Sequence, residues 1–206
     1  MIRETLLSMF NASLYAVFLY NFIFSGGLGT TEVIRAAKKN GGMLAFAGLI
    51  SFFSMLTSAV SRLLTIWIPS FETLSFAWRC LLFGGILLVL YLLTGVALAF
   101  LKIRAQVFLL KYLGMAVLNT LVMAIPFLNF QRSHDLPRAL AFGLGAGIAF
   151  AGASLLINSG MHKLQQNKSI PVMFTGVPAT LIYTGLLALA FTGFTGASLF
   201  GAEGGI

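Results

Sequence analysis

Two asparagines stand in otherwise apolar stretches, each beside residues that interrupt a helix. Asn21 precedes Gly26-Gly27-Leu28-Gly29-Thr30-Thr31, where glycine permits positive φ angles and threonine hydroxyls can satisfy freed backbone groups. Asn119 precedes Thr120 and Pro126, and proline cannot donate a helical hydrogen bond. Within a membrane, backbone that leaves the helix must be buried in protein or line a cavity, so the two interruptions predict a functional site.

Few other side chains offer chemistry. Cys80 is the only cysteine, so it can form neither an internal disulfide nor a cluster cage, and we expect it to pack as a small apolar residue. His134 and His162 adjoin expected loops without a carboxylate or second histidine at metal-ligand spacing, which favours a surface or interface role. The sequence therefore predicts no catalytic residue and no metal ligand, and it makes an isolated enzyme of the soluble type a poor hypothesis.

Composition places the chain in a membrane. Of its 206 residues, 59% are hydrophobic and only 9% charged, and the mean hydropathy is +0.97, whereas soluble domains carry about 25% charged residues. A helix needs about 20 apolar residues to cross the hydrocarbon. Runs of that kind lie at 5–31, 41–61, 80–101, 112–131, 139–161 and 169–202. Six such spans leave no room for a soluble catalytic domain.

The net charge of +8 is explained by topology rather than by nucleic-acid binding. One set of alternate loops holds Arg35, Lys38, Lys39, Lys102, Arg104, Lys163 and Lys168, with Glu32 as its lone acid. The other set holds Arg3, Arg62, Arg132 and Arg138, diluted by Glu4, Glu72, Asp135 and Glu203. The positive-inside rule puts the first set in the cytoplasm and both termini outside. The expected contact for these charges is membrane lipid, with no nucleic acid involved.

Several side chains lie where spans should meet the lipid headgroups: Arg62, Arg79, Lys111, Trp67 and Trp78. The long basic side chains are expected to snorkel to the surface, and the two tryptophans suit an interfacial aromatic belt. Glu32 lies beside the first interruption and three residues before Arg35. That spacing favours a local ion pair, with a cation path as the alternative.

The hydrophobic pattern restarts near Leu101, which divides the chain into residues 1–100 and 101–206. Short sequences recur at corresponding places: Leu98-Ala99-Phe100 with Leu189-Ala190-Phe191, and Leu44-Ala45-Phe46 with Leu140-Ala141-Phe142. An odd number of spans per half turns the second half over. The sequence thus predicts a single all-α membrane domain of six transmembrane helices, built as two inverted three-helix repeats with discontinuous first and fourth helices.

In an inverted repeat of this kind, the two interrupted helices meet near the membrane midplane. We expect these candidate site residues to gather there: Asn21, Gly27, Gly29, Thr31, Asn119 and Thr120. The alternative is that the small residues only let helices approach closely, as glycine and alanine do in many membrane bundles.

A family resemblance rests on motifs spread along nearly the whole chain. They are Asn21-Phe22, Leu28-Gly29, Asn119, Leu128-Asn129, His134, Phe142-Gly143-Leu144-Gly145-Ala146 and the closing Leu189-Ala190-Phe191-Thr192-Gly193-Phe194-Thr195-Gly196. In these residues the chain resembles the small six-span membrane subunits of the Rnf and Nqr complexes. The pattern is most similar to the A subunit of Rnf, which corresponds to the E subunit of Nqr, and it is also like their paired subunits, the E subunit of Rnf and the D subunit of Nqr.

The resemblance implies a membrane subunit of a redox-driven ion pump in the prokaryotic cytoplasmic (inner) membrane. In that family a second six-helix subunit of the same fold lies in the opposite orientation. The pair holds one iron-sulfur cluster through cysteines at the broken helices, and the cluster passes electrons between flavin-bearing subunits. Soft thiolates are the ligands that such a cluster needs.

This chain departs from the family pattern at the cluster. The two cysteine positions are occupied by Thr31 and Thr120, and Glu32 stands where a proline usually follows the first cysteine. Threonine hydroxyls are hard, neutral ligands and cannot replace thiolates. The resemblance therefore implies a non-catalytic subunit of an Rnf/Nqr-like electron-transfer complex without the usual 2Fe–2S cluster, binding no cofactor of its own beside partners that carry flavin and iron-sulfur groups.

A second hypothesis uses the same inverted repeat in a chain that itself carries no electron. The chain would then be a transporter or scaffold subunit for a small molecule or cation, including a role in flavin-linked electron transfer to the outer surface. The first hypothesis predicts a partner of the same fold and nearby flavin-bearing subunits. The second predicts a polar cavity at the interruptions.

Overall fold

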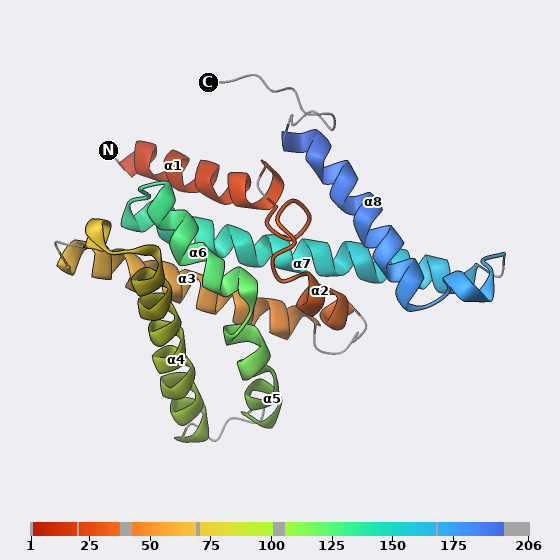
Figure 1. Cartoon of the computed structure of the whole chain (residues 1–206), viewed down its shortest axis with the longest axis horizontal. Helices are drawn as coiled ribbons and strands as arrows, with labels where there is room; N and C mark the ends of the chain where they lie inside the picture. Colours follow the sequence, from red (N-terminus) through yellow and green to blue (C-terminus); the bar gives the residue numbers. More distant parts are fainter. Residues whose placement is uncertain are drawn as a thin grey trace.

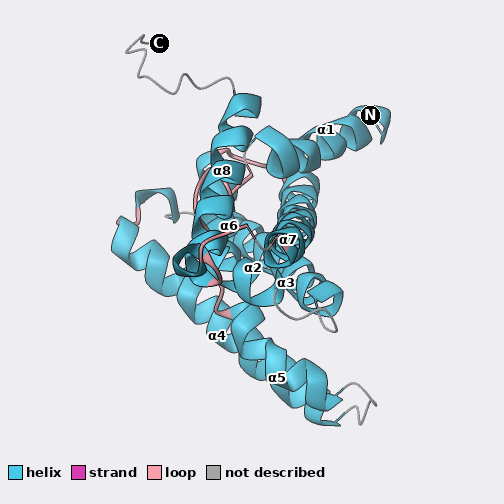
Figure 2. Ribbon diagram, turned by 90° about the vertical axis from the view of Figure 1, so that its right-hand side faces the viewer, coloured by secondary structure: helices cyan, strands magenta, loops and turns pink. Residues whose placement is uncertain are grey.

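The structure is a computed structural model that describes residues 2–19, 21–37, 43–68, 71–100, 106–167 and 169–195. Within these ranges every regular element is helical (Figure 2), which confirms the predicted all-α class. Strands are absent from the described segments because the long apolar runs satisfy their backbone groups within each helix.

The first predicted interruption is present. Helix α1 (Ile2–Leu14) continues into a π-helical turn, η1 (Tyr15–Leu19), and helix resumes only at α2 (Thr30–Ala37). Between them Gly27 and Gly29 have φ angles of +66° and +72°. Left-handed backbone costs a side-chain-bearing residue about 1–2 kcal/mol, which explains why glycine occupies both positions.

The next two helices are uninterrupted. α3 (Met43–Trp67) and α4 (Phe76–Phe100) each contain 25 residues, and the short 3-10 turn η2 (Phe71–Thr73) lies between them. At 1.5 Å per residue each helix is about 37 Å long, enough to cross about 30 Å of hydrocarbon.

The second predicted interruption divides α5 (Gln106–Val117) from α6 (Thr120–Gln131), and the two helices are bent by 45°. The chain then forms α7 (Leu136–Gln166), the 3-10 turn η3 (Val172–Phe174) and α8 (Val177–Thr195). Helix therefore resumes with a threonine after each interruption, at Thr30 and at Thr120.

The core is built on α3 and α7, which run along each other through the centre of the molecule (Figure 1). Gly143 and Gly147 of α7 face α3, where an added Cβ would lie 2.6 Å from the Ser54 carbonyl oxygen or 2.4 Å from Ser51 Cα. Gly145 makes the equivalent approach to Ser13 of α1, at 2.7 Å from its carbonyl oxygen. Small residues allow this backbone approach, as at many helix contacts in membranes.

Three helices in the described ranges are long and apolar enough to cross a membrane: α3, α4 and α7. The bent pair of α5 and α6 makes a fourth candidate if it is counted as one span. α8 is apolar but shorter, and residues 196–202 of its expected span lie outside the described residues. The count of six spans and the inverted repeat of residues 1–100 and 101–206 remain predictions.

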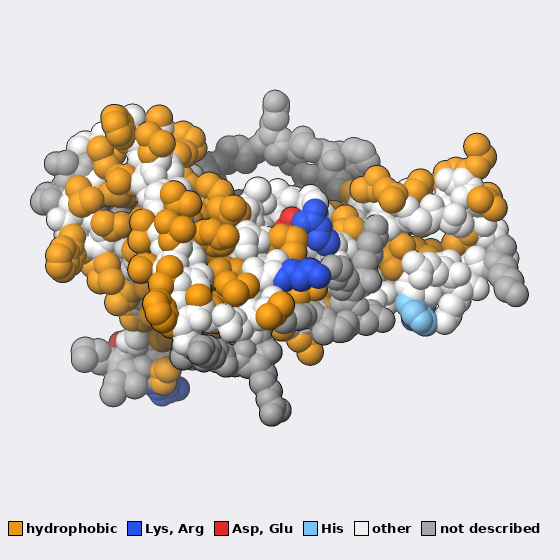
Figure 3. All heavy atoms as spheres, turned by 90° about the horizontal axis from the view of Figure 1, so that it is seen from below, with side chains coloured by type: hydrophobic (Ala, Val, Ile, Leu, Met, Phe, Trp, Pro, Cys, Tyr) orange, Lys and Arg blue, Asp and Glu red, His pale blue; other side chains and the backbone are white. Residues whose placement is uncertain are grey.

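Two parts of the chain contribute little to this core. α4 and α5 lie side by side and project away from the axis of α3 and α7, and α8 crosses the end of α7 (Figure 1). Phe83 and Leu87 are the buried residues of α4 in the described structure. Hydrophobic side chains cover much of the surface on the side from which α4 and α5 project (Figure 3). Such a surface suits contact with lipid or with other apolar helices.

The predicted membrane orientation depends on charges that are only partly described. Lys38, Lys39, Lys102, Arg104, Lys168 and Glu203 lie outside the described residues. The position of both termini on the outer side therefore remains a prediction. The two tryptophans expected at the headgroups are both exposed, Trp67 to 82% and Trp78 to 61%.

Candidate functional site

The Asn21 side chain forms hydrogen bonds with backbone groups that the first interruption leaves without helical partners. Asn21 is 3% exposed. Its Oδ1 accepts hydrogen bonds from the N–H groups of Ile23 and Phe24, at 3.2 and 3.3 Å, and its Nδ2 donates to the Val17 carbonyl at 3.0 Å. An apolar side chain here would leave buried backbone groups without partners, which costs about 1–3 kcal/mol per group.

Asn119 has the same role at the second interruption. It is buried and is the N-cap of α6, with its Oδ1 accepting from the Leu121 N–H at 3.0 Å. Each asparagine thus accepts from the residue two positions further on, a local pattern that Asn favours. The Asn119 Nδ2 is buried and has no hydrogen-bond partner among the described residues.

The two interruptions meet. The Gly29 N–H donates to Thr120 Oγ1 at 2.9 Å, which joins residues 91 positions apart. A Cβ on Gly29 would lie 2.9 Å from Asn119 Oδ1 and 3.2 Å from Leu121 Cβ. Gly29, Asn119 and Thr120 are therefore three of the predicted site residues that the fold brings into contact, and glycine is required at the junction for space as well as for its φ angle.

The other predicted site residues lie close by along the chain. Gly27 is exposed, and its carbonyl accepts from the Thr30 hydroxyl at 2.8 Å. Thr31 is exposed in the first turn of α2, and Thr120 is exposed at the start of α6. The gathering of all six residues at the membrane midplane remains a prediction.

The charges beside the junction are paired locally. Arg35 Nη1 lies 3.1 Å from Glu32 Oε2, which confirms the predicted ion pair. The same nitrogen lies 3.1 Å from the Met115 sulfur and so links α2 to α5. Glu32 has a partner in this structure, and its carboxylate sits in the first turn of α2, where the helix dipole favours negative charge.

The junction offers hydrogen-bond donors and two helix N-termini, a set suited to an acceptor or a negatively charged group. It does not suit an iron-sulfur cluster. Thr120 Oγ1 accepts the Gly29 N–H, and the lone Cys80 is at the start of α4. In the described parts of the chain no group of three or more His, Cys, Asp or Glu side chains could hold a metal. Soft ligands for iron are thus missing from this junction.

Removing the hydrogen bond between Gly29 and Thr120 should lower the stability of the chain by a measurable amount. Thr120→Val keeps the side-chain volume but removes the acceptor of the Gly29 N–H, so we expect a loss of about 1–2 kcal/mol in the free energy of unfolding. Thr120→Ser keeps the hydroxyl and should change stability by less than about 0.5 kcal/mol. Thermal unfolding of both variants in the same detergent checks this. Equal stability of the two would show that the bond contributes nothing.

Sequence reasoning missed a polar network at the other end of α6. Asn129 Nδ2 donates to Ser58 Oγ of α3 at 2.9 Å, and His134 Nδ1 lies 2.9 Å from Asn129 Oδ1. Asn129 and Ser58 are buried. His134 packs its ring edge-on against Phe142 at 5.1 Å between centroids, and its surface or interface role remains a prediction. Only the position of Asn129 on the buried face of an expected helix could have signalled the network.

Burial lowers the pKa of His134, with further lowering from Arg132 and Arg138, and Asp135 opposes the shift. The native state therefore favours the neutral imidazole, whereas the unfolded chain takes up a proton near pH 6.5. The stability that the native state gains from a neutral His134 is fully present above about pH 6.5. It is lost as the pH falls toward the lowered native pKa. We expect the unfolding temperature of the wild-type chain to decrease as the pH falls from about 7.5 to about 5. In His134→Gln the decrease over the same pH range should be smaller. An identical pH dependence in the variant would contradict the assignment.

Comparison with known proteins supports the resemblance. No family model matches the chain. It is 36% identical over 85 residues to the A subunit of the ion-translocating oxidoreductase complex of Cereibacter sphaeroides, a match that covers 41% of this chain and 44% of the relative.

Two further relatives align over most of the chain. One is the A subunit of the Na⁺-translocating ferredoxin:NAD⁺ oxidoreductase complex of Acetobacterium woodii, 26% identical over 89% of this chain and 95% of the relative. The other is the A subunit of the ion-translocating oxidoreductase complex of Syntrophotalea carbinolica, 25% identical over 88% and 93%. The chain is thus homologous to the A subunit of the Rnf complex across most of its length, at about 26% identity.

Proposed function

We propose that the chain is the membrane component that corresponds to the A subunit in an Rnf-type, ion-translocating electron-transfer complex. The observation that carries the proposal is the junction of Gly29 and Thr120, because two interrupted helices meet in a chain whose homologues are the A subunits of such complexes. The chain itself is non-catalytic in this proposal, and it sits as a multi-pass protein in the bacterial cytoplasmic membrane with both termini outside.

A partner of the same six-helix fold in the opposite orientation completes the proposal. Ser25, Gly26 and Gly27 of the first interruption are exposed, as are Thr31 and Thr120. Irregular backbone in a membrane cannot face lipid, so it needs a protein cover. A second six-span protein whose own interrupted helices meet this surface would supply that cover.

In this assembly the chain keeps the joined interruptions without holding the 2Fe–2S cluster. Hydroxyl groups at positions 31 and 120, and the hydrogen bond that occupies Thr120, support this part of the proposal. Electrons would then enter and leave through cofactors of partner subunits, which we propose to carry flavin and iron-sulfur groups. The chain would serve as the membrane frame that fixes their positions.

The experiment that tests this function is isolation of the full-length chain from its native membranes in mild detergent, followed by mass spectrometry and flavin extraction. We expect a second six-span protein and at least one flavoprotein to co-purify in fixed proportion. Recovery of the chain alone, with ion or solute flux in vesicles and no flavoprotein, would favour the transporter hypothesis and contradict the redox assembly.

A further inference from the structure

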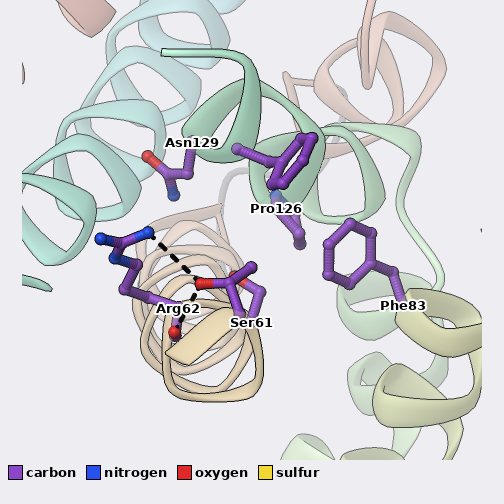
Figure 4. Close-up of a pocket in the computed structure, with 7 residues that line it drawn as sticks. Ser61, Arg62, Phe83, Pro126 and Asn129 are labelled. Carbon is purple, nitrogen blue, oxygen red and sulfur yellow. Dashed lines mark hydrogen bonds between the residues drawn. The ribbon is translucent and has the colours of Figure 1, made fainter. Parts of the chain in front are cut away.

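A small recess lies between α3, α4 and α6, at the opposite end of α6 from the junction of the interruptions. The residues that line it are Ser61, Arg62, Thr65, Phe83, Pro126, Asn129 and Phe130. Its volume is about 220 Å³ including the open mouth, and it has room for roughly one water-sized group in contact with its lining. Arg62 and Asn129 approach it from α3 and α6, and Phe83 closes the side toward α4 (Figure 4).

Most hydrogen-bond donors of this recess are already used within the protein. The Ser61 hydroxyl donates to the Ser58 carbonyl at 3.0 Å, and the Thr65 hydroxyl donates to the Arg62 carbonyl at 2.7 Å. Asn129 Nδ2 donates to Ser58 Oγ. Arg62 Nη1 donates to Thr65 Oγ1 at 3.3 Å, whereas its Nε is buried and has no partner in the part of the chain that the structure describes. The group that completes this site must therefore be an acceptor.

The charge of the recess selects an anion. Arg62 is the only charged residue among the described residues that line it. A second guanidinium lies at its edge, because Arg79 stacks on Phe130 with 4.8 Å from its central carbon to the ring centroid. Two fixed positive charges repel a cation, and an acceptor bound to a guanidinium is held more strongly if it is negatively charged.

The position of the recess along α3 matches the headgroup region. Residue 62 lies about seven residues from the middle of α3, so its Cα is about 10 Å from the centre of a helix about 37 Å long. The hydrocarbon ends about 15 Å from its midplane, within reach of an arginine side chain. Trp67 is the last residue of α3 and Trp78 lies in the first turn of α4, and Ile66 and Phe76, which lie next to them in the sequence or two residues away, are exposed to 60% and 69%.

We propose that this recess binds the phosphate of a phospholipid headgroup through Arg62. One phosphate oxygen enters the recess and accepts from Nε, while the remaining headgroup lies at the mouth near Arg79. The acyl chains run along the exposed apolar residues of α3 and α4. The sequence predicted that Arg62 snorkels to the headgroups; the buried Nε adds a donor that a headgroup oxygen can satisfy.

This site is separate from the proposed electron-transfer role. Asn129 lies about 15 Å along α6 from Asn119 at the junction of the interruptions. The lipid site requires only that α3 and α4 cross the membrane. Its test can therefore fail without affecting the proposed function.

The test is native mass spectrometry of the purified full-length chain in detergent, with phosphatidylglycerol and with diacylglycerol of the same acyl chains. The wild-type chain should retain phosphatidylglycerol about fivefold better than diacylglycerol, as expected for one guanidinium near a phosphate. Arg62→Gln should reduce this preference to about one. Arg138→Gln removes an exposed arginine from the start of α7 and should keep the preference.

Thermal unfolding separates binding from folding. Phosphatidylglycerol should raise the unfolding temperature of the wild-type chain and of Arg138→Gln but not that of Arg62→Gln. Arg62→Lys keeps the charge but lacks Nε, so its unfolding temperature should rise by about half as much as that of the wild type. Unchanged lipid preference in both Arg62 variants would overturn the proposal and would indicate a bound water. The same Arg62-dependent shift with inorganic phosphate alone would overturn the lipid as the source of the phosphate.

Discussion

Gly147→Ala should destabilise the chain by about 3 kcal/mol, the upper part of the usual range for overpacking. An added Cβ would lie 1.8 Å from Ser51 Oγ and 2.4 Å from Ser51 Cα. The hydroxyl can rotate away, but the Cα belongs to the backbone of α3 and cannot. α3 and α7 must then separate along the contact that forms the core. At about 2–4 °C per kcal/mol, the unfolding temperature should decrease by roughly 6–12 °C.

A matched control lies on the same helix. A Cβ on Gly152 would meet nothing within 4 Å, so Gly152→Ala should leave stability unchanged or raise it by up to about 1 kcal/mol through helix propensity. Thermal unfolding of both variants in one detergent compares them directly. Similar unfolding temperatures for Gly147→Ala and Gly152→Ala would show that close packing of α3 on α7 does not hold the core together.

Gly29→Ala should destabilise the junction of the interruptions by about 2–3 kcal/mol. The φ angle of +72° accounts for about 1 kcal/mol, and contact of the new Cβ with Asn119 Oδ1 at 2.9 Å disturbs the cap of α6 for the remainder. Alanine keeps the backbone N–H, but relief of this clash moves that N–H away from Thr120 Oγ1, so the two interruptions should separate. The measurable results are a lower unfolding temperature and reduced recovery of the six-span partner that we propose.

Gly27→Ala isolates the cost of the φ angle. Gly27 has φ +66°, but a Cβ there would meet nothing within 4 Å, so the expected loss is only about 1 kcal/mol. Partner recovery should be retained in this variant. Equal losses for Gly27→Ala and Gly29→Ala, in stability and in partner recovery, would contradict a specific contact between the two interruptions.

The first interruption was predictable because glycine acts locally. The second lies at Leu118 and Asn119, whereas Pro126, which the sequence offered as an interrupter, lies inside α6. Gly27 and Gly29 adopt positive φ, and helix resumes at Thr30 and Thr120, close to where the sequence placed the breaks. Asn21 and Asn119 were identified as site residues from their apolar surroundings. Their capping of the backbone explains why amides occur there, and it is a structural role that polarity alone does not reveal.

Contacts between distant segments could not be predicted in the same way. Nothing in the residues around Gly29 specifies Thr120 as the acceptor of its N–H, because that bond depends on how α2 and α6 dock. The network of Ser58, Asn129 and His134 likewise joins three segments. The buried Nε of Arg62 could not be predicted either, since a sequence pattern gives the depth of a side chain in the membrane but not the shape of the protein around it.

The central claim is our proposal that the joined interruptions of this chain hold no iron-sulfur cluster at positions 31 and 120. The most direct measurement is iron content and electron paramagnetic resonance of the isolated assembly, compared among the wild type, Thr31→Val/Thr120→Val and Thr31→Ser/Thr120→Ser. We predict the same iron content and the same signals per intact assembly in all three, because neither hydroxyl binds iron. Loss of iron and of a 2Fe–2S signal in the valine variant, with both retained in the serine variant, would contradict the claim.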